Sequence, residues 1–218
     1  MGHEFAVRDS RLLIDAPILA VRRDAVTMPG GEVANREIVE HFGAVAVVAY
    51  DRQRDAIAMV HQYRHAVGRH LWELPAGILD VAGESALDTA KRELQEEVGL
   101  AAQTWSVLVD LVTSPGVCDE AVRVFVAQDL SAVEQPVPQE EEAEMTMQWV
   151  ELSAARDMVF SGQLHNSIAV AGVLSAWAVL RDGASARPVD TPFDLRPTAL
   201  AGRRQAAGVP AGADMKRP

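Results

Sequence analysis

Residues 77–100 read GILDVAGESALDTAKRELQEEVGL, and this stretch decides the fold. Within it, Glu93, Glu96 and Glu97 are spaced three and four residues apart, so on a helix they share one face. Like-charge pairs at this spacing cost roughly a few tenths of a kcal/mol each, and folding alone does not require them. Hard divalent cations such as Mg²⁺ prefer oxygen ligands. The stretch therefore indicates a metal site, although acidic helix faces are most often solvated surface.

The residues around the glutamates predict where this helix begins, ends and packs. Ser85 with Asp88 three residues later is typical of a capping box, and Gly99 is typical of a C-terminal stop. The opposite face is apolar at positions 87, 90, 94 and 98, so it can pack on a core. Upstream, residues 71–76 predict a short strand that leads into a glycine-containing loop. A strand, a loop and an acidic helix in this order form a plausible site rather than a random surface.

Length and composition restrict the class of protein. The chain has 218 residues and 49% hydrophobic residues, enough for one sizeable domain and an extra element. Its formal net charge of −11 argues against binding the backbone of a long nucleic acid. The single cysteine, Cys118, excludes an internal disulfide and fits a reducing compartment. No secretion signal opens the chain, and the apolar run at 168–180 is too short to span a bilayer. We expect a soluble cytoplasmic protein with no nucleic-acid or membrane partner.

Hydrophobic patterning divides the chain into three regions. Residues 1–41 alternate between apolar and polar around a turn at 28–31, which predicts an antiparallel hairpin without a core of its own. Residues 42–182 form the main domain, and residues 183–218, rich in Gly, Ala, Pro and Arg, are expected to be a flexible tail. Further strands are predicted at 42–50, 56–60, 105–112, 121–127 and 147–152, and further helices at 153–160 and 167–180. This mixture predicts an α/β sandwich with a mixed sheet.

The acidic stretch resembles the Nudix box. From Glu84 to Leu100 every fixed position matches, including the seven-residue gap before Arg92. The leading glycine departs from the pattern, because six residues rather than five separate Gly77 from Glu84. Motifs outside the box are similar to those of the ADP-ribose pyrophosphatase family: QYR at 62–64, WELPAG at 72–77, TSPG at 113–116 and DE at 119–120. The resemblance covers residues 10–180 and implies a Nudix-type α/β/α sandwich.

The resemblance implies a metal-dependent hydrolase. Two or three Mg²⁺ or Mn²⁺ ions would be bound by four residues: Glu93, Glu96, Glu97 and, through its backbone carbonyl, Ala76. Glu84 could complete the outer ligation or orient metal-bound water, as could Glu96. Arg92 would hold these carboxylates in place rather than contact substrate.

A catalytic base must come from outside the metal ligands. The family carries a glutamate on a loop before a late strand, and the loop at residues 139–144 supplies candidates. Glu142 aligns best, Glu141 comes next, and Glu140 and Glu144 remain alternatives. A carboxylate next to a metal could take a proton from water. A plain acidic loop is the alternative reading of this run.

Substrate contacts are also implied by the resemblance. Arg64 could bind two phosphate oxygens with one guanidinium. The remaining candidates are Arg36 and Glu37 for adenine or ribose across a dimer, Gly77 and Ile78 in the box loop, and Ser114, Gly116 and Glu120 near the far ribose. Where relatives stack adenine on an aromatic residue, this chain has Ile18 and Leu19.

The implied activity is hydrolysis of the diphosphate of ADP-ribose to AMP and ribose 5-phosphate by a homodimer that exchanges its N-terminal strands. Two other functions remain open. One is hydrolysis of another nucleoside diphosphate sugar or of an oxidised nucleoside diphosphate. The other is a non-catalytic ADP-ribose-binding regulator, which usually loses the box glutamates and gains a DNA-binding module.

Overall fold

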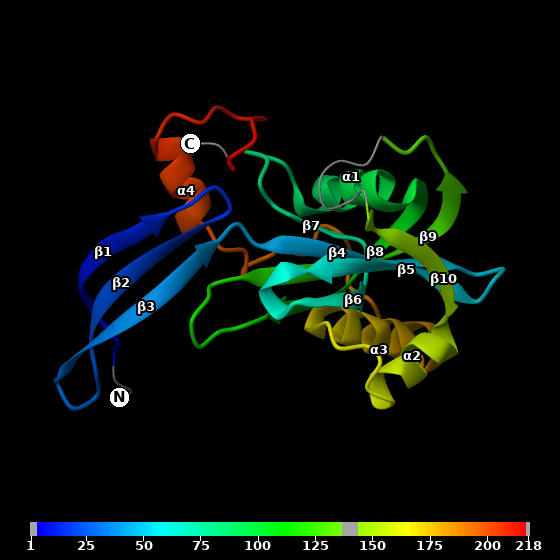
Figure 1. Cartoon of the computed structure of the whole chain (residues 1–218), viewed down its shortest axis with the longest axis horizontal. Helices are drawn as coiled ribbons and strands as arrows, with labels where there is room; N and C mark the ends of the chain where they lie inside the picture. The colour runs from blue at the N-terminus through cyan, green and yellow to red at the C-terminus, as the bar shows by residue number, and fades with distance from the viewer. Residues whose placement is uncertain (1–3, 137–143, 217–218) are drawn as a thin grey trace.

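Two β-sheets organise the chain in the computed structural model, which describes residues 4–136 and 144–216 (Figure 1). The larger sheet has seven strands in the order β10-β5-β4-β9-β8, with β6 paired to β5 and β7 paired to β4. Its strands are β4 (Ala44–Asp51), β5 (Ala56–Arg64), β6 (Arg69–Glu73), β7 (Ala76–Ile78), β8 (Leu100–Val112), β9 (Ala121–Ala132) and β10 (Thr146–Glu151). β4 and β9 run parallel and the other pairs antiparallel, which confirms the predicted mixed sheet.

Strand β4 lies at the centre of the sheet and is buried on both faces. Its side chains alternate between two cores, because successive residues of a strand point to opposite faces. Ala46 and Val48 pack toward α2 (Leu152–Phe160) and α3 (Ser167–Arg181), whereas Val45 and Val47 pack toward α1 (Ala86–Val98). The sheet is thus covered by helices on both faces, as the predicted α/β/α sandwich requires (Figure 1). Within the described residues, no helix is both long and apolar enough to cross a lipid bilayer.

The N-terminal region forms a separate antiparallel sheet that projects from the main layers (Figure 1). It contains β1 (Val7–Asp15), β2 (Leu19–Thr27) and β3 (Val33–His41) in the order β1-β2-β3. The predicted hairpin corresponds to β2 and β3. The additional strand β1 was not predicted, since all nine of its residues are exposed and no buried face marks it in the sequence.

The C-terminal region differs from the expected flexible tail. It contains a helix, α4 (Ala199–Ala206), and runs along both sheets as far as residue 216. Leu200 and Met215 are fully buried beside Phe42 from the beginning of the main domain. Earlier in the same region, the carbonyls of Thr191 and Pro192 accept hydrogen bonds from buried Arg123. These contacts are made by single residues that are not spaced at a helical or strand period. The sequence therefore carries no periodic signal here, and its composition alone predicted a flexible tail.

A 3₁₀ turn, η1 (His65–Val67), joins β5 to β6 and completes the list of regular elements. It ends at Gly68, whose φ of 63° is left-handed and thus favours glycine. The turn places the end of β5 next to the start of β6, where the two strands form an antiparallel pair. Residues of both strands line the same pocket as β7.

Candidate active site

Helix α1 begins and ends as predicted. The Oγ of Ser85 accepts a hydrogen bond from the backbone N–H of Asp88 at 3.1 Å and donates one to its carboxylate at 2.7 Å. Gly99 adopts a left-handed φ of 63° and closes the last turn. Because Leu94 and Val98 are buried under the sheet, the helix is fixed in rotation. Two of its glutamates, Glu93 and Glu97, therefore face β7.

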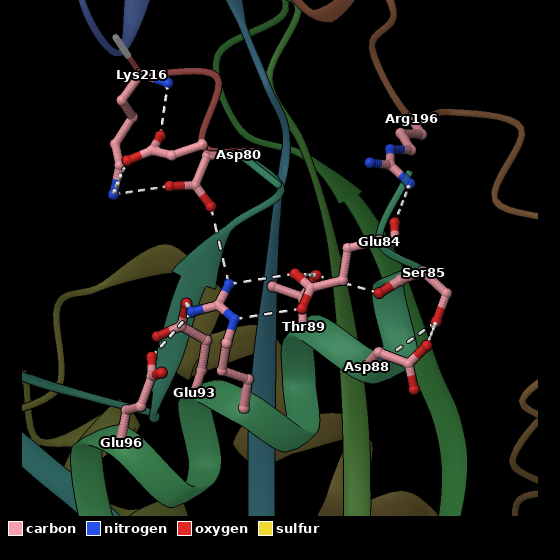
Figure 2. Close-up of polar contacts among 11 residues, drawn as sticks. Asp80, Glu84, Ser85, Asp88, Thr89, Glu93, Glu96, Arg196 and Lys216 are labelled. Atoms are coloured by element: carbon pink, nitrogen blue, oxygen red, sulfur yellow. Dashed lines mark hydrogen bonds and ion pairs between the residues drawn. The ribbon is translucent and has the colours of Figure 1, made fainter. Parts of the chain in front are cut away.

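The guanidinium of Arg92 contacts the carboxylates of Glu84, Glu93 and Glu96, three residues labelled in Figure 2. Its Nη1 lies 2.7 Å from Oε1 of Glu93 and 2.9 Å from Oε2 of Glu96. Its Nε and Nη2 each lie 3.3 Å from an oxygen of Glu84. Burial lowers the pKa of Arg92, but the contacts with Glu84, Glu93 and Glu96 outweigh it and raise that pKa. Arg92 is consequently a permanent cation that balances three carboxylates.

Strand β7 brings Glu93 and Glu97 to one place. The backbone N–H of Ala76 donates a hydrogen bond to Oε2 of Glu97 at 2.9 Å. Glu93 lies against Gly77 so closely that a Cβ added there would be 2.1 Å from its Cδ. Two carboxylates of the helix thus converge on two consecutive residues of β7.

The donor chemistry of this place suits a hard divalent cation. Carboxylate oxygens and a backbone carbonyl are the ligands that Mg²⁺ and Mn²⁺ prefer. Within residues 4–136 and 144–216, no three His, Cys, Asp or Glu side chains already stand at the spacing of a metal site. Arg92 instead holds Glu93 and Glu96. Because these contacts use only Oε1 of Glu93 and Oε2 of Glu96, a cation would be bound through the second oxygen of each carboxylate.

The pKa of the Glu93 carboxyl group is strongly shifted. Burial raises the pKa of Glu93 to about 7, and Arg92 only partly opposes this effect. Because this folded-state pKa lies above the ordinary value of 4.5, the protonated form is favoured in the fold. The resulting contribution to stability is full below pH 4.5 and is lost as the pH rises through about 7.

This perturbation predicts a pH-dependent stability difference. In EDTA, the wild type should lose stability relative to Glu93→Gln between about pH 5 and about pH 8, since glutamine cannot ionise. Thermal unfolding of both proteins across this range measures it. Glu151→Gln, which alters an exposed carboxylate at the end of β10, should follow the wild type. Parallel curves for the wild type and Glu93→Gln would contradict the prediction.

A pocket of about 450 Å³ opens beside β7. Several residues expected to contact substrate line it: Arg64, Gly77, Ile78 and Glu120, together with Ala76 and Ile18. Glu120 lies 3.5 Å from Nδ1 of His41, at the end of β3, and accepts a hydrogen bond from Thr113. The pocket thus extends from β7, against which Glu93 and Glu97 lie, to His41 at the end of β3.

Arg64 is oriented by a residue that sequence reasoning missed. Glu73, on β6, is almost fully buried and binds Arg64 through two contacts, Nε to Oε1 at 3.0 Å and Nη2 to Oε2 at 2.8 Å. Gln62 donates to the same carboxylate at 3.2 Å. The available signal was the position of Glu73 between Trp72 and Leu74, because a charge inside an apolar strand needs a partner.

Among residues 4–136 and 144–216, the other residues predicted to contact substrate or to act as the base do not line this pocket. Arg36 and Glu37 lie on β3 in the projecting sheet, where Glu37 pairs with Arg23 at 2.6 Å. Ser114 and Gly116 lie in the loop between β8 and β9 and are exposed. The predicted base Glu142, with the alternatives Glu140 and Glu141, falls outside the described residues. The remaining alternative, Glu144, is exposed just before β10.

Several known proteins are similar to this chain. Residues 40–167 match the family model described as NUDIX domain. The ADP-ribose pyrophosphatase of Mycobacterium tuberculosis is 55% identical over 202 residues, which are 93% of this chain and 97% of that protein. The ADP-ribose pyrophosphatase of Bacillus subtilis is 39% identical over 142 residues, 65% of this chain and 76% of that protein.

Two further similarities extend the comparison. The methanol dehydrogenase activator of Bacillus methanolicus is 35% identical over 156 residues, 72% of this chain and 83% of that protein. A crystal structure of an ADP compounds hydrolase superposes with a TM-score of 0.71, covering 84% of this chain and 97% of that one. At 19% identity this structural match concerns the fold alone.

Proposed function

Because this chain belongs to the NUDIX family, whose model matches residues 40–167, we propose that it hydrolyses the diphosphate of ADP-ribose to AMP and ribose 5-phosphate. The observation that carries the proposal is the 55% identity with an ADP-ribose pyrophosphatase over 93% of this chain. The site agrees with it, since Glu93 and Glu97 converge on β7 beside a pocket large enough for part of a nucleotide. An intact set of glutamates favours an enzyme over a non-catalytic regulator.

The chain's own carboxylates would hold the metal. We assign two or three Mg²⁺ or Mn²⁺ ions to Glu93, Glu96, Glu97 and the backbone carbonyl of Ala76. When bound, such an ion lowers the pKa of a water molecule and neutralises charge on the diphosphate oxygens. The contacts of Arg92 with Glu84, Glu93 and Glu96 support a role for Arg92 and Glu84 in holding the ligands in place.

The reaction needs one residue to take a proton from the attacking water and another to bind the phosphate oxygens. We assign to Glu142 the removal of a proton from the attacking water, with Glu141, Glu140 and Glu144 as alternatives. The new P–O bond forms from this water while the bridging P–O bond breaks, which separates AMP from ribose 5-phosphate. Arg64 would stabilise the charge that develops on the phosphate oxygens. Its orientation by Glu73 at the pocket wall supports this assignment.

The two ends of the substrate would lie on either side of the phosphates. Gly77, Ile78 and Glu120 line the pocket. Gly77 and Ile78 are suited to contact the substrate near its diphosphate, and the carboxylate of Glu120 is suited to contact the far ribose. Ser114 and Gly116 belong to the loop that carries Glu120, and we assign them to the far ribose. Arg36 and Glu37 would contact adenine or ribose of a substrate bound to a second subunit.

That last assignment requires a homodimer, which we propose on the basis of the N-terminal sheet. Strand β1 is exposed along its whole length although it carries apolar side chains, among them Leu12 and Ile14. A sheet that projects from the core in this way would bury its surface against a second copy. Light scattering should give about twice the chain mass of 23.5 kDa. A mass of one chain at micromolar concentration would exclude the dimer.

Product identification tests the proposed activity. ADP-ribose, GDP-mannose and 8-oxo-dGDP are incubated separately with the protein, with Mg²⁺ or with EDTA, and the products are resolved by chromatography. We expect AMP and ribose 5-phosphate from ADP-ribose, formed fastest among the three and only with Mg²⁺. Faster turnover of another diphosphate would retain the hydrolase but replace its substrate. Binding of ADP-ribose without any turnover would favour the regulator instead.

A further inference from the structure

The loop between β7 and α1 is held by a distant segment of the chain. Residues 212–216, termed here the C-terminal ribbon, run antiparallel to residues 80–82 of this loop, with Val81 opposite Asp214. Three backbone hydrogen bonds join them: Ala82 N–H to the carbonyl of Ala213 at 3.0 Å, Gly212 N–H to the carbonyl of Ala82 at 2.6 Å, and Met215 N–H to the carbonyl of Asp80 at 2.8 Å. The loop that supplies Glu84 therefore has a strand-like partner.

The C-terminal region is itself firmly attached. Met215 is 1% exposed and packs with Ala82 and Leu200 in one apolar cluster. In α4, Arg203 pairs with buried Glu40 of β3 at 2.9 Å, and Arg204 pairs with Asp15 of β1 at 2.6 Å. The C-terminal region thus links the loop, through the ribbon, to the N-terminal sheet, through α4.

An ion pair between Lys216 and Asp80 also joins the ribbon to the loop (Figure 2). Asp80 is 5% exposed and lies between two cations. Nζ of Lys216 is 2.8 Å from its Oδ2, and Nη2 of Arg92 is 3.8 Å from its Oδ1. The hydrogen bond with Asp80 raises the pKa of Lys216, so the ammonium group stays charged. A second contact from the same region, Arg196 Nη1 to the carbonyl of Glu84 at 3.3 Å, reaches the other end of the loop.

We propose that Lys216 is a positioning residue for the proposed metal site, because it satisfies Asp80 and leaves Arg92 to hold the glutamates of α1. Without the ammonium group, Asp80 would be a buried carboxylate with Arg92 as its nearest cation. Arg92 would then move toward Asp80 and away from Glu93 and Glu96. The glutamates would lose their common partner, and the preorganisation of the site would fall. This inference rests on the proposed function only in assigning the metal to those glutamates.

Calorimetric titration of Mg²⁺ alone into the full chain tests the inference without any substrate. Lys216→Met should weaken Mg²⁺ binding about tenfold, the scale found when residues behind metal ligands are removed. Lys216→Arg should stay close to the wild type, because a guanidinium can also pair with Asp80. The matched control is Lys91→Met, since Lys91 lies near the middle of α1 and pairs loosely with Asp88 at 3.9 Å. Binding by Lys216→Met within twofold of the wild type would overturn the proposal.

A double-mutant cycle separates positioning from general loss of structure. Asp80→Asn removes the carboxylate that competes for Arg92, so adding Lys216→Met to it should have little further effect on Mg²⁺ affinity. Additive losses, or an equal loss in Lys216→Arg, would mean that Lys216 only supports the fold and would overturn the proposal. If ADP-ribose is not hydrolysed by the wild type while the cycle behaves as expected, the substrate assignment fails and the positioning role stands.

Discussion

Glu97→Gln is expected to lower kcat for ADP-ribose by about a hundred- to a thousandfold, the scale of losing one preorganised electrostatic group at a reaction centre. The substitution removes the negative charge but keeps an oxygen that can accept the hydrogen bond from the N–H of Ala76, now 2.9 Å long. Folding should accordingly be preserved. Steady-state kinetics measured with saturating Mg²⁺, together with thermal unfolding, test both parts of this prediction.

The control for Glu97→Gln is Glu151→Gln, the same chemical change at an exposed carboxylate far along the chain. It should leave both kcat and the unfolding temperature unchanged. Loss of folding in Glu97→Gln would mean that the carboxylate is structural rather than functional. Full activity in a folded Glu97→Gln would remove this residue from the proposed metal ligands.

Gly77→Ala should lower kcat about a hundredfold, because a displacement of about 1 Å in a reactive group can cost that much. The added Cβ would lie 2.1 Å from Cδ and from Oε1 of Glu93, a distance that no real contact allows. The Glu93 carboxylate would have to leave its place against β7. Crowding of this kind also destabilises a fold by about 1–3 kcal/mol. Kinetics as a function of Mg²⁺ concentration and denaturant unfolding measure the two effects.

Gly202→Ala is the matched control for Gly77→Ala, since a Cβ added in α4 meets nothing within 4 Å. Alanine is also favoured over glycine in a helix, so this variant should be at least as stable as the wild type. Unchanged kinetics in Gly77→Ala would show that Glu93 can be displaced without consequence. Its assignment as a metal ligand would then be wrong.

Local sequence signals predicted the elements that carry the site. The capping pair Ser85–Asp88 and Gly99 predicted where α1 begins and ends from neighbouring residues alone. The structure confirms both ends of the helix. The apolar run of β4 likewise required no distant information, since a strand buried on both faces needs apolar side chains throughout. Periodicity is a property of neighbouring residues, which explains why these predictions succeeded.

Contacts between distant segments could not be predicted in the same way. Lys216 and Asp80 form a close ion pair, yet no sequence pattern near either residue indicates that the other is its partner. The same holds for the partner of Arg64, because Glu73 is reached only when β5 and β6 pair. The exposed strand β1 lacked a buried face altogether. Pairing of this type depends on topology rather than on residue periodicity.

The C-terminal region that holds the loop between β7 and α1 also determines when the site can be completed during biosynthesis. Arg196 follows Glu84 by 112 residues, and Arg204 follows Ala16 by 188. Chains emerge from the ribosome N-terminal part first, and contacts between remote segments form slowly because a long loop must close. A nascent chain therefore exposes the entire acidic helix well before its loop acquires this partner. Tight metal binding would then belong to the finished polypeptide, not to the chain still being translated.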